Sequence, residues 1–225
     1  PVLAGLDAAG VPPLVFDQVR EDPPEATIEA AATKAREGRV DGIVAVGGGS
    51  SMDVGKVVAA LLGGEQTLAE LYGVGQISGG RLPLVLVPTT AGTGSEVTPV
   101  AVVTTGETTK AGISSPVLLP DVALLDAQLT LGLPPRVTAM TGVDAMVHAI
   151  EAYTSRHKKN VLSDSLARQA LALLARNIRI AVKDGKNLAA RENMLLGACL
   201  AGQAFANAPV AAVHALAYPL GGHYH

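Results

Sequence analysis

The sequence has 225 residues, enough for one large domain or two small ones with a buried core. Hydrophobic residues make up 48% and charged residues 16%, a balance that excludes a disordered chain. The formal net charge is −3, and no cluster of Lys and Arg would neutralise several phosphates of a polymer. Nucleic acid is therefore not an expected partner.

The distribution of apolar residues and the cysteine content bear on location. The longest apolar stretches are of strand length, or are helices interrupted by polar residues, so no membrane span is expected. Cys199 is the single cysteine, which excludes an internal disulfide framework and is typical of a reducing compartment. We therefore expect a cytoplasmic protein.

Strand-like and helix-like segments alternate in the first part of the sequence. A short apolar run covers residues 14–16, and residues 26–36 and 50–62 predict helices that glycines bring to an end. Continuous apolar runs predict four buried strands, at residues 42–46, 84–87, 100–103 and 122–125. This alternation predicts a parallel sheet covered by helices.

The pattern changes after Pro134-Pro135. Residues 136–217 show helical periods separated by short polar breaks, and no convincing strand. We therefore predict a boundary near Leu133, with an α/β domain over residues 1–133 and an all-helical domain over residues 134–225.

A glycine-rich loop, VAVGGGSSMD, covers residues 44–53. Three glycines between a strand and a helix let backbone N–H groups approach an anion, and Ser50 or Ser51 can cap the helix whose N-terminus then faces that anion. A pyrophosphate fits this arrangement, and so does a turn that needs glycine only for its geometry. Lys56 lies one turn into the helix and is expected to be solvated or paired.

A second loop, PTTAGTGSE, covers residues 88–96 and follows the strand that ends at Val87. It offers hydroxyls and glycines at the predicted carboxyl edge of the same sheet, where open α/β sheets bind ligands. Two such loops at one edge indicate a nucleotide with several oxygens to satisfy. A pair of ordinary Thr- and Ser-rich loops remains the alternative.

The helical half carries a possible metal site. Asp144 and His148 are four residues apart, so they share a helix face among apolar neighbours, and a divalent cation would offset the cost of burying the carboxylate. His214 lies in another apolar helix. One carboxylate and two imidazoles suit Fe²⁺ or Zn²⁺, while hydrogen-bonded core residues are the alternative. Glu151 is expected to be structural, either solvated or paired on its helix.

The order and spacing of these motifs resemble those of one known family. GGGS-x-x-D at residues 47–53, PTTAGTGSE at 88–96, GVD-x-x-x-H-x-x-E at 142–151 and VH at 213–214 resemble the signatures of the iron-containing (group III) alcohol dehydrogenases. The resemblance covers essentially the whole sequence. It implies an N-terminal dinucleotide-binding α/β domain and an all-helical C-terminal domain, the dehydroquinate synthase-like architecture, truncated at both ends relative to the family.

The resemblance also implies roles for single residues. Asp144, His148 and His214 resemble metal ligands of the family and are the expected catalytic residues. The implied cofactor contacts are Gly48, Gly49, Ser50, Asp53, Thr89, Thr90, Thr93, Lys110 and Leu129. Within this set, Lys110 matches a lysine that reaches the cofactor ribose, and Leu129 a residue beside the nicotinamide.

The sequence departs from the family pattern at several positions. The family has a fourth metal ligand fourteen residues after His214, which falls beyond the last residue, and His223 and His225 are not at that spacing. Many members carry a histidine, proposed as a proton relay, where Tyr218 stands here. Asp22-Pro23 replaces a common Asn-Pro.

The resemblance implies an enzyme that transfers a hydride between a small alcohol, aldehyde or ketone and NAD, with NADP as the alternative. A divalent metal, Fe²⁺ or otherwise Zn²⁺, polarises the alcohol oxygen. A homodimer is the expected assembly. Two competing readings are a zinc-dependent glycerol or hydroxy-acid dehydrogenase of the same superfamily, and a nucleotide-binding protein without catalysis.

Overall fold

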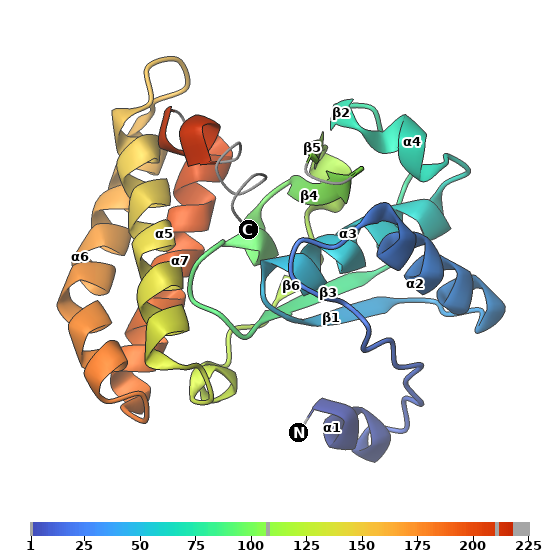
Figure 1. Cartoon of the computed structure of the whole chain (residues 1–225), viewed down its shortest axis with the longest axis horizontal. Helices are drawn as coiled ribbons and strands as arrows, with labels where there is room; N and C mark the ends of the chain where they lie inside the picture. Colours follow the sequence, from blue (N-terminus) through green and yellow to red (C-terminus); the bar gives the residue numbers. More distant parts are fainter. Residues whose placement is uncertain (1, 107–108, 210–211, 218–225) are drawn as a thin grey trace.

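The computed structural model describes residues 2–106, 109–209 and 212–217. Long helices lie on one side of the molecule, and a region that contains both helices and strands lies on the other (Figure 1). The predicted fold class, an α/β region followed by an all-helical region, is confirmed.

The first sheet is parallel, with the strand order β1-β3-β6. Its strands are β1 (Ile43–Gly47), β3 (Leu84–Pro88) and β6 (Val122–Ala123), which match three of the predicted apolar runs. Gly47 pairs with Pro88 in the register, so the glycine-rich loop and the threonine-rich loop start side by side. The prediction that both loops leave the same edge of one sheet is therefore confirmed.

The second sheet was not predicted. It has the order β2-β5-β4, with β2 (Gly73–Val74), β5 (Thr109–Ser114) and β4 (Val100–Thr105). The apolar run at residues 100–103 does form a strand, but it pairs antiparallel with β5 instead of joining the parallel sheet. The sequence of β5 contains no apolar run because Ile113 is its single buried residue, as expected for a strand that buries only one face.

A helix packs on one face of β1 in the parallel sheet, while Val44 and Val46 on the other face are exposed, so the prediction that this strand is buried is wrong. α2 (Glu25–Glu37) and α3 (Gly49–Gly63) occupy the predicted helical stretches. The short helices α1 (Val2–Ala8) and α4 (Leu68–Leu71) and three 3₁₀ turns complete this half: η1 (Ser95–Val97), η2 (Pro116–Leu118) and η3 (Ala127–Thr130). The run at residues 14–16 is not a strand; it is irregular, and Phe16 packs against the core.

The other half is a bundle of α5 (Pro135–Thr154), α6 (Val161–Lys183) and α7 (Leu188–Asn207), and residues 212–217 are also helical. Asn160 and Asn187 cap α6 and α7 by accepting hydrogen bonds from backbone N–H groups. Alanines dominate the core of this bundle, so the helices pack closely. Within the described part of the chain, no helix is long and apolar enough to cross a bilayer.

The two halves meet at a contact between backbones. Gly94, at the start of η1, has a φ of 61°, and a Cβ there would lie 2.6 Å from the Cα of Gly202 in α7. A Cβ on Gly202 would in turn lie 2.8 Å from the Cα of Gly94. Neither atom could move away without shifting main chain, so the loop and the helix approach this closely only because both positions are glycine.

Replacing Gly202 with alanine tests this contact. We expect a loss of about 1–3 kcal/mol in the free energy of unfolding, because overpacking outweighs the gain of about 1 kcal/mol in helix propensity. Gly5→Ala is the matched control, since that helical glycine has no atom within 4 Å of the added methyl group. Urea unfolding followed by circular dichroism measures both variants, and equal midpoints would contradict the proposed constraint.

Candidate active site

Three metal-ligating side chains predicted from the sequence converge in the structure. Asp144, His148 and His214 each offer a ligand atom, and these atoms lie within 4.8 Å of one another. The nearest Asp144 oxygen is 3.9 Å from Nε2 of His148 and 3.7 Å from Nε2 of His214. Two imidazole nitrogens and one carboxylate oxygen at this spacing form a donor set that suits Fe²⁺ or Zn²⁺.

Packing fixes the His148 ring. It stacks on Phe205 and on His214, with 4.5 Å between ring centroids in both pairs. Burial lowers the pKa of His148, which favours the neutral imidazole that binds metals. Asp144 is only partly buried, with 38% of its side chain exposed, because this carboxylate faces a cavity instead of the predicted buried surface.

Glu151 extends this cluster, and its environment differs from the sequence expectation. Asp144, His148 and Glu151 occupy positions i, i+4 and i+7 of α5, so they share one helix face. Glu151 is 4% exposed, and its carboxylate contacts Nδ1 of His214 and accepts a 2.7 Å hydrogen bond from the backbone N–H of Val213. The spacing in the sequence indicates that Glu151 lies on the same helix face as Asp144 and His148, but it does not predict where His214 lies.

The glycine-rich loop ends at the N-terminus of α3. The helix begins at Gly49 with Gly48 as its N-cap and no side-chain cap, so the prediction that Ser50 or Ser51 caps it is wrong. The first N–H groups of a helix lack intrahelical acceptors and attract anions. A Cβ on Gly49 would lie 2.8 Å from Cγ2 of Thr93, so the two predicted loops approach closely here.

A buried network lies beneath this helix. Lys56 is fully buried and donates hydrogen bonds to Ser95 Oγ and to the Val100 carbonyl, both at 2.8 Å. Ser95 in turn donates to Asp53 Oδ1 at 2.6 Å, and burial raises the pKa of Asp53. Burial lowers the pKa of Lys56 to about 8, while Asp53 and Glu96 oppose this shift. Of the two predicted alternatives for Lys56, the paired one is correct.

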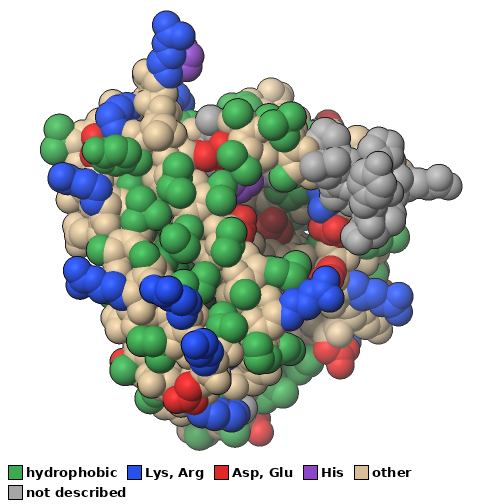
Figure 2. Space-filling model, turned by 60° about the vertical axis from the view of Figure 1, so that its left-hand side comes forward, with side chains coloured by type: hydrophobic (Ala, Val, Ile, Leu, Met, Phe, Trp, Pro, Cys, Tyr) green, Lys and Arg blue, Asp and Glu red, His purple; other side chains and the backbone are tan. Residues whose placement is uncertain are grey.

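A cavity of about 580 Å³ connects these features. Figure 2 shows a hollow on one face of the molecule, with acidic side chains inside it. Of the residues predicted to bind the cofactor or a metal, those that line the cavity are Gly49, Ser50, Asp53, Thr93, Lys110, Asp144, His148 and His214. Lys110 forms a 2.6 Å ion pair there with Asp22, another lining residue.

The remaining predicted contacts are not part of the cavity lining: Gly48, Thr89, Thr90 and Leu129. Gly48 and Thr90 face each other across the two loops, with 3.5 Å between a Cβ built on Gly48 and the threonine side chain. Leu129 is half-buried in η3. Tyr218, His223 and His225 lie outside the described residues.

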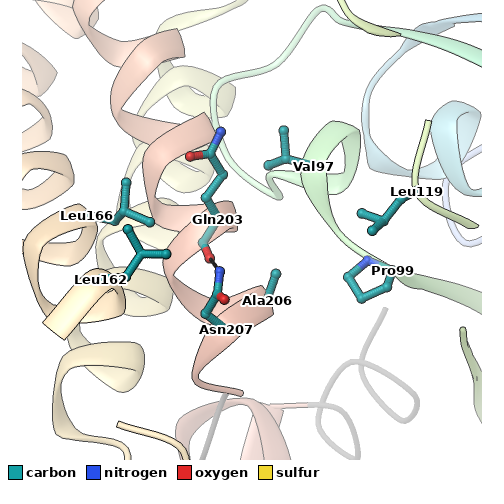
Figure 3. A pocket seen from close by; sticks show the side chains of 8 residues that line it. All are labelled: Val97, Pro99, Leu119, Leu162, Leu166, Gln203, Ala206 and Asn207. Carbon is teal, nitrogen blue, oxygen red and sulfur yellow. Dashed lines mark hydrogen bonds between the residues drawn. The ribbon is translucent and has the colours of Figure 1, made fainter. Parts of the chain in front are cut away.

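A second, smaller cavity of about 370 Å³ adjoins the first, and both are lined by Pro99 and Ala206. Figure 3 shows its other lining side chains, which come from η1, the end of η2, α6 and α7: Val97, Leu119, Leu162, Leu166, Gln203 and Asn207. Among the described residues that line it, none has a titratable side chain. Proton or metal chemistry is therefore assigned to the larger cavity.

Comparison with known proteins decides the family. Residues 1–127 match the family model described as iron-containing alcohol dehydrogenase, and residues 138–225 match that of the C-terminal part of the Fe-containing alcohol dehydrogenase family. The chain belongs to the iron-containing alcohol dehydrogenase family. The resemblance inferred from the motifs is thereby confirmed.

Relatives within the iron-containing alcohol dehydrogenases carry different substrate names. Long-chain-alcohol dehydrogenase 1 of Geobacillus thermodenitrificans is 47% identical over 94% of this chain and 54% of its own length. A crystal structure of 1,3-propanediol oxidoreductase is 43% identical with a TM-score of 0.95, covering 99% of this chain and 58% of that one.

A sulfoacetaldehyde reductase from Bifidobacterium kashiwanohense, solved in complex with NAD⁺, is 34% identical with a TM-score of 0.88, covering 99% of this chain and 61% of that one. The chain spans about half the length of the curated relatives it matches.

The buried network around Lys56 leads to a prediction about the stability of the protein. Lys56→Met keeps the aliphatic stem but removes the ammonium group that Ser95, Val100 and Asp53 face. We expect a loss of about 3–5 kcal/mol in the free energy of unfolding, as for other broken buried ion pairs. Lys183→Met, on the exposed end of α6, is the control and should cost less than about 1 kcal/mol. Chemical denaturation measures both, and similar losses would refute the role of Lys56.

Proposed function

We propose that the chain forms the cofactor and metal site of an NAD(P)-dependent alcohol dehydrogenase that interconverts a small alcohol and its aldehyde or ketone. One observation carries this proposal: the N-terminus of α3 and the Asp144, His148 and His214 cluster open into the same cavity. Redox transfer needs a dinucleotide and an activated substrate to meet in one space, and this cavity provides that space.

The residues fit a divalent metal. His148 is buried and stacked, and its Nε2 faces the Asp144 carboxylate, 3.9 Å from one oxygen. Asp144 supplies a carboxylate oxygen and His214 a second imidazole. The family name favours iron, while zinc accepts the same donors. When bound, the metal supplies Lewis-acid polarisation of an alcohol oxygen, and the nicotinamide accepts the hydride.

The chain's own residues supply binding and orientation. The N-terminus of α3, with Gly49 and Ser50 on the cavity wall, would hold the pyrophosphate of the cofactor. Lys110, paired with Asp22 on the cavity wall, would offer N–H donors to the ribose of a bound cofactor. NAD is the proposed dinucleotide because a relative that is 34% identical has been solved with NAD⁺.

The substrate is proposed to be a small alcohol. The names of the relatives range from long-chain alcohols to 1,3-propanediol and sulfoacetaldehyde, so the scaffold tolerates several substituents. Phe205 and Ala206 bring apolar surface to the metal cluster, where the carbon chain of an alcohol would pack. We also propose a division at Leu133, between a dinucleotide-binding domain and a metal-binding domain.

Replacing His148 with alanine tests the metal assignment. We expect the bound metal and the turnover of alcohol with NAD⁺ each to fall by at least about 100-fold, because losing only an outer partner of a ligand typically costs about 10–100-fold. Plasma mass spectrometry measures the metal content, and NADH absorbance measures turnover.

His157→Ala is the matched control, since His157 is exposed between α5 and α6 and should leave both quantities at the wild-type level. The assignment is wrong if His148→Ala retains metal and turnover. If the unaltered protein binds NADH tightly without stoichiometric metal, it is instead a nucleotide-binding protein without this catalysis.

A further inference from the structure

A single carboxylate holds the segment that carries His214. Glu151 lies on α5, more than sixty residues away in the sequence, and it is buried. One of its oxygens accepts a hydrogen bond from the Val213 backbone, near the start of the helical segment 212–217. The other oxygen contacts Nδ1 of His214. Both contacts hold this segment against α5.

The contact with Glu151 defines which nitrogen of His214 is available. A carboxylate oxygen is an acceptor, so Nδ1 of His214 must carry the hydrogen in this contact. In the imidazole that binds a metal, Nε2 then holds the lone pair, and Nε2 is the nitrogen that lies 3.7 Å from Asp144. Stacking on His148 keeps the ring in this plane, with 14° between the two rings.

We propose that Glu151 is a positioning residue that orients His214 for metal binding and selects its Nδ1–H tautomer. It does so without being a ligand itself, since its carboxylate is engaged by Val213 and His214 and is not among the side chains that line the cavity. The negative charge also increases the basicity of the ring, which strengthens the bond from Nε2 to a cation. This inference rests on the proposed metal site.

Glu151→Gln separates this role from simple packing. Glutamine has nearly the same shape, but its side chain has one acceptor oxygen and a donor NH₂ group. It can therefore satisfy either Val213 N–H or His214 Nδ1–H, and it presents a donor to the other. Glu151→Ala removes both acceptors. Glu192→Gln, an exposed glutamate on α7, is the matched control.

The experiment titrates the metal-free full chain with Zn²⁺ against a competing chelator, and measures NADH affinity by fluorescence in the same preparations. We expect Glu151→Gln to weaken Zn²⁺ binding by about 10–100-fold, and Glu151→Ala by at least as much. NADH affinity should stay at the wild-type level in Glu151→Gln, which shows that the cavity is still folded. Glu192→Gln should match the wild type in both measurements.

Two outcomes overturn the inference. If Glu151→Gln binds Zn²⁺ as tightly as the wild type, the carboxylate does not position His214. A lower melting temperature of the metal-free variant with unchanged Zn²⁺ affinity leads to the same conclusion, since it shows a purely structural brace. Failure of the wild type to bind any metal overturns the proposed function itself, and this result is distinct from equal binding by wild type and variant.

Discussion

The site depends on a contact that contains no side chains. Gly94 and Gly202 bring the loop after β3 against α7 at backbone distance, and any Cβ at either position would separate the two halves. Ser95, the residue after Gly94, donates a hydrogen bond to Asp53, which lies in α3 just after the glycine-rich loop. α7 packs on α5, which carries Asp144 and His148. The glycine pair therefore lets the loop that leads to Ser95 lie directly against the helix that packs on α5.

Two clusters of ionisable groups, one in each half of the molecule, balance their buried charges in different ways. In the α/β half, Lys56 meets the carboxylate of Asp53 and the hydroxyl of Ser95. An ammonium group has donors but no lone pair, so this cluster is closed to a cation and acts as an internal brace. In the helical half, carboxylates face imidazoles, which can release a proton and present a lone pair. Only the second cluster is chemically open to a metal.

Much of the fold followed from local patterns. The runs that became β1 and β3 are apolar without interruption, and this pattern predicted both strands. β3 is mostly buried, whereas β1 leaves Val44 and Val46 exposed. β5 buries one face and alternates weakly, and therefore it was missed. The expected serine cap would start α3 later, after Ser50 or Ser51. The helix instead begins at Gly49, because Gly48 ends the preceding extended segment and serves as the N-cap.

The sequence by itself determined that Asp144, His148 and Glu151 share a helix face, because the period of the α-helix fixes that relation locally. It also determined that two glycine- and hydroxyl-bearing loops follow strands. Only the tertiary structure decided that His214 joins this face and that Glu151 holds it. That contact spans more than sixty residues, and its geometry arises from the packing of whole helices, which no local spacing records.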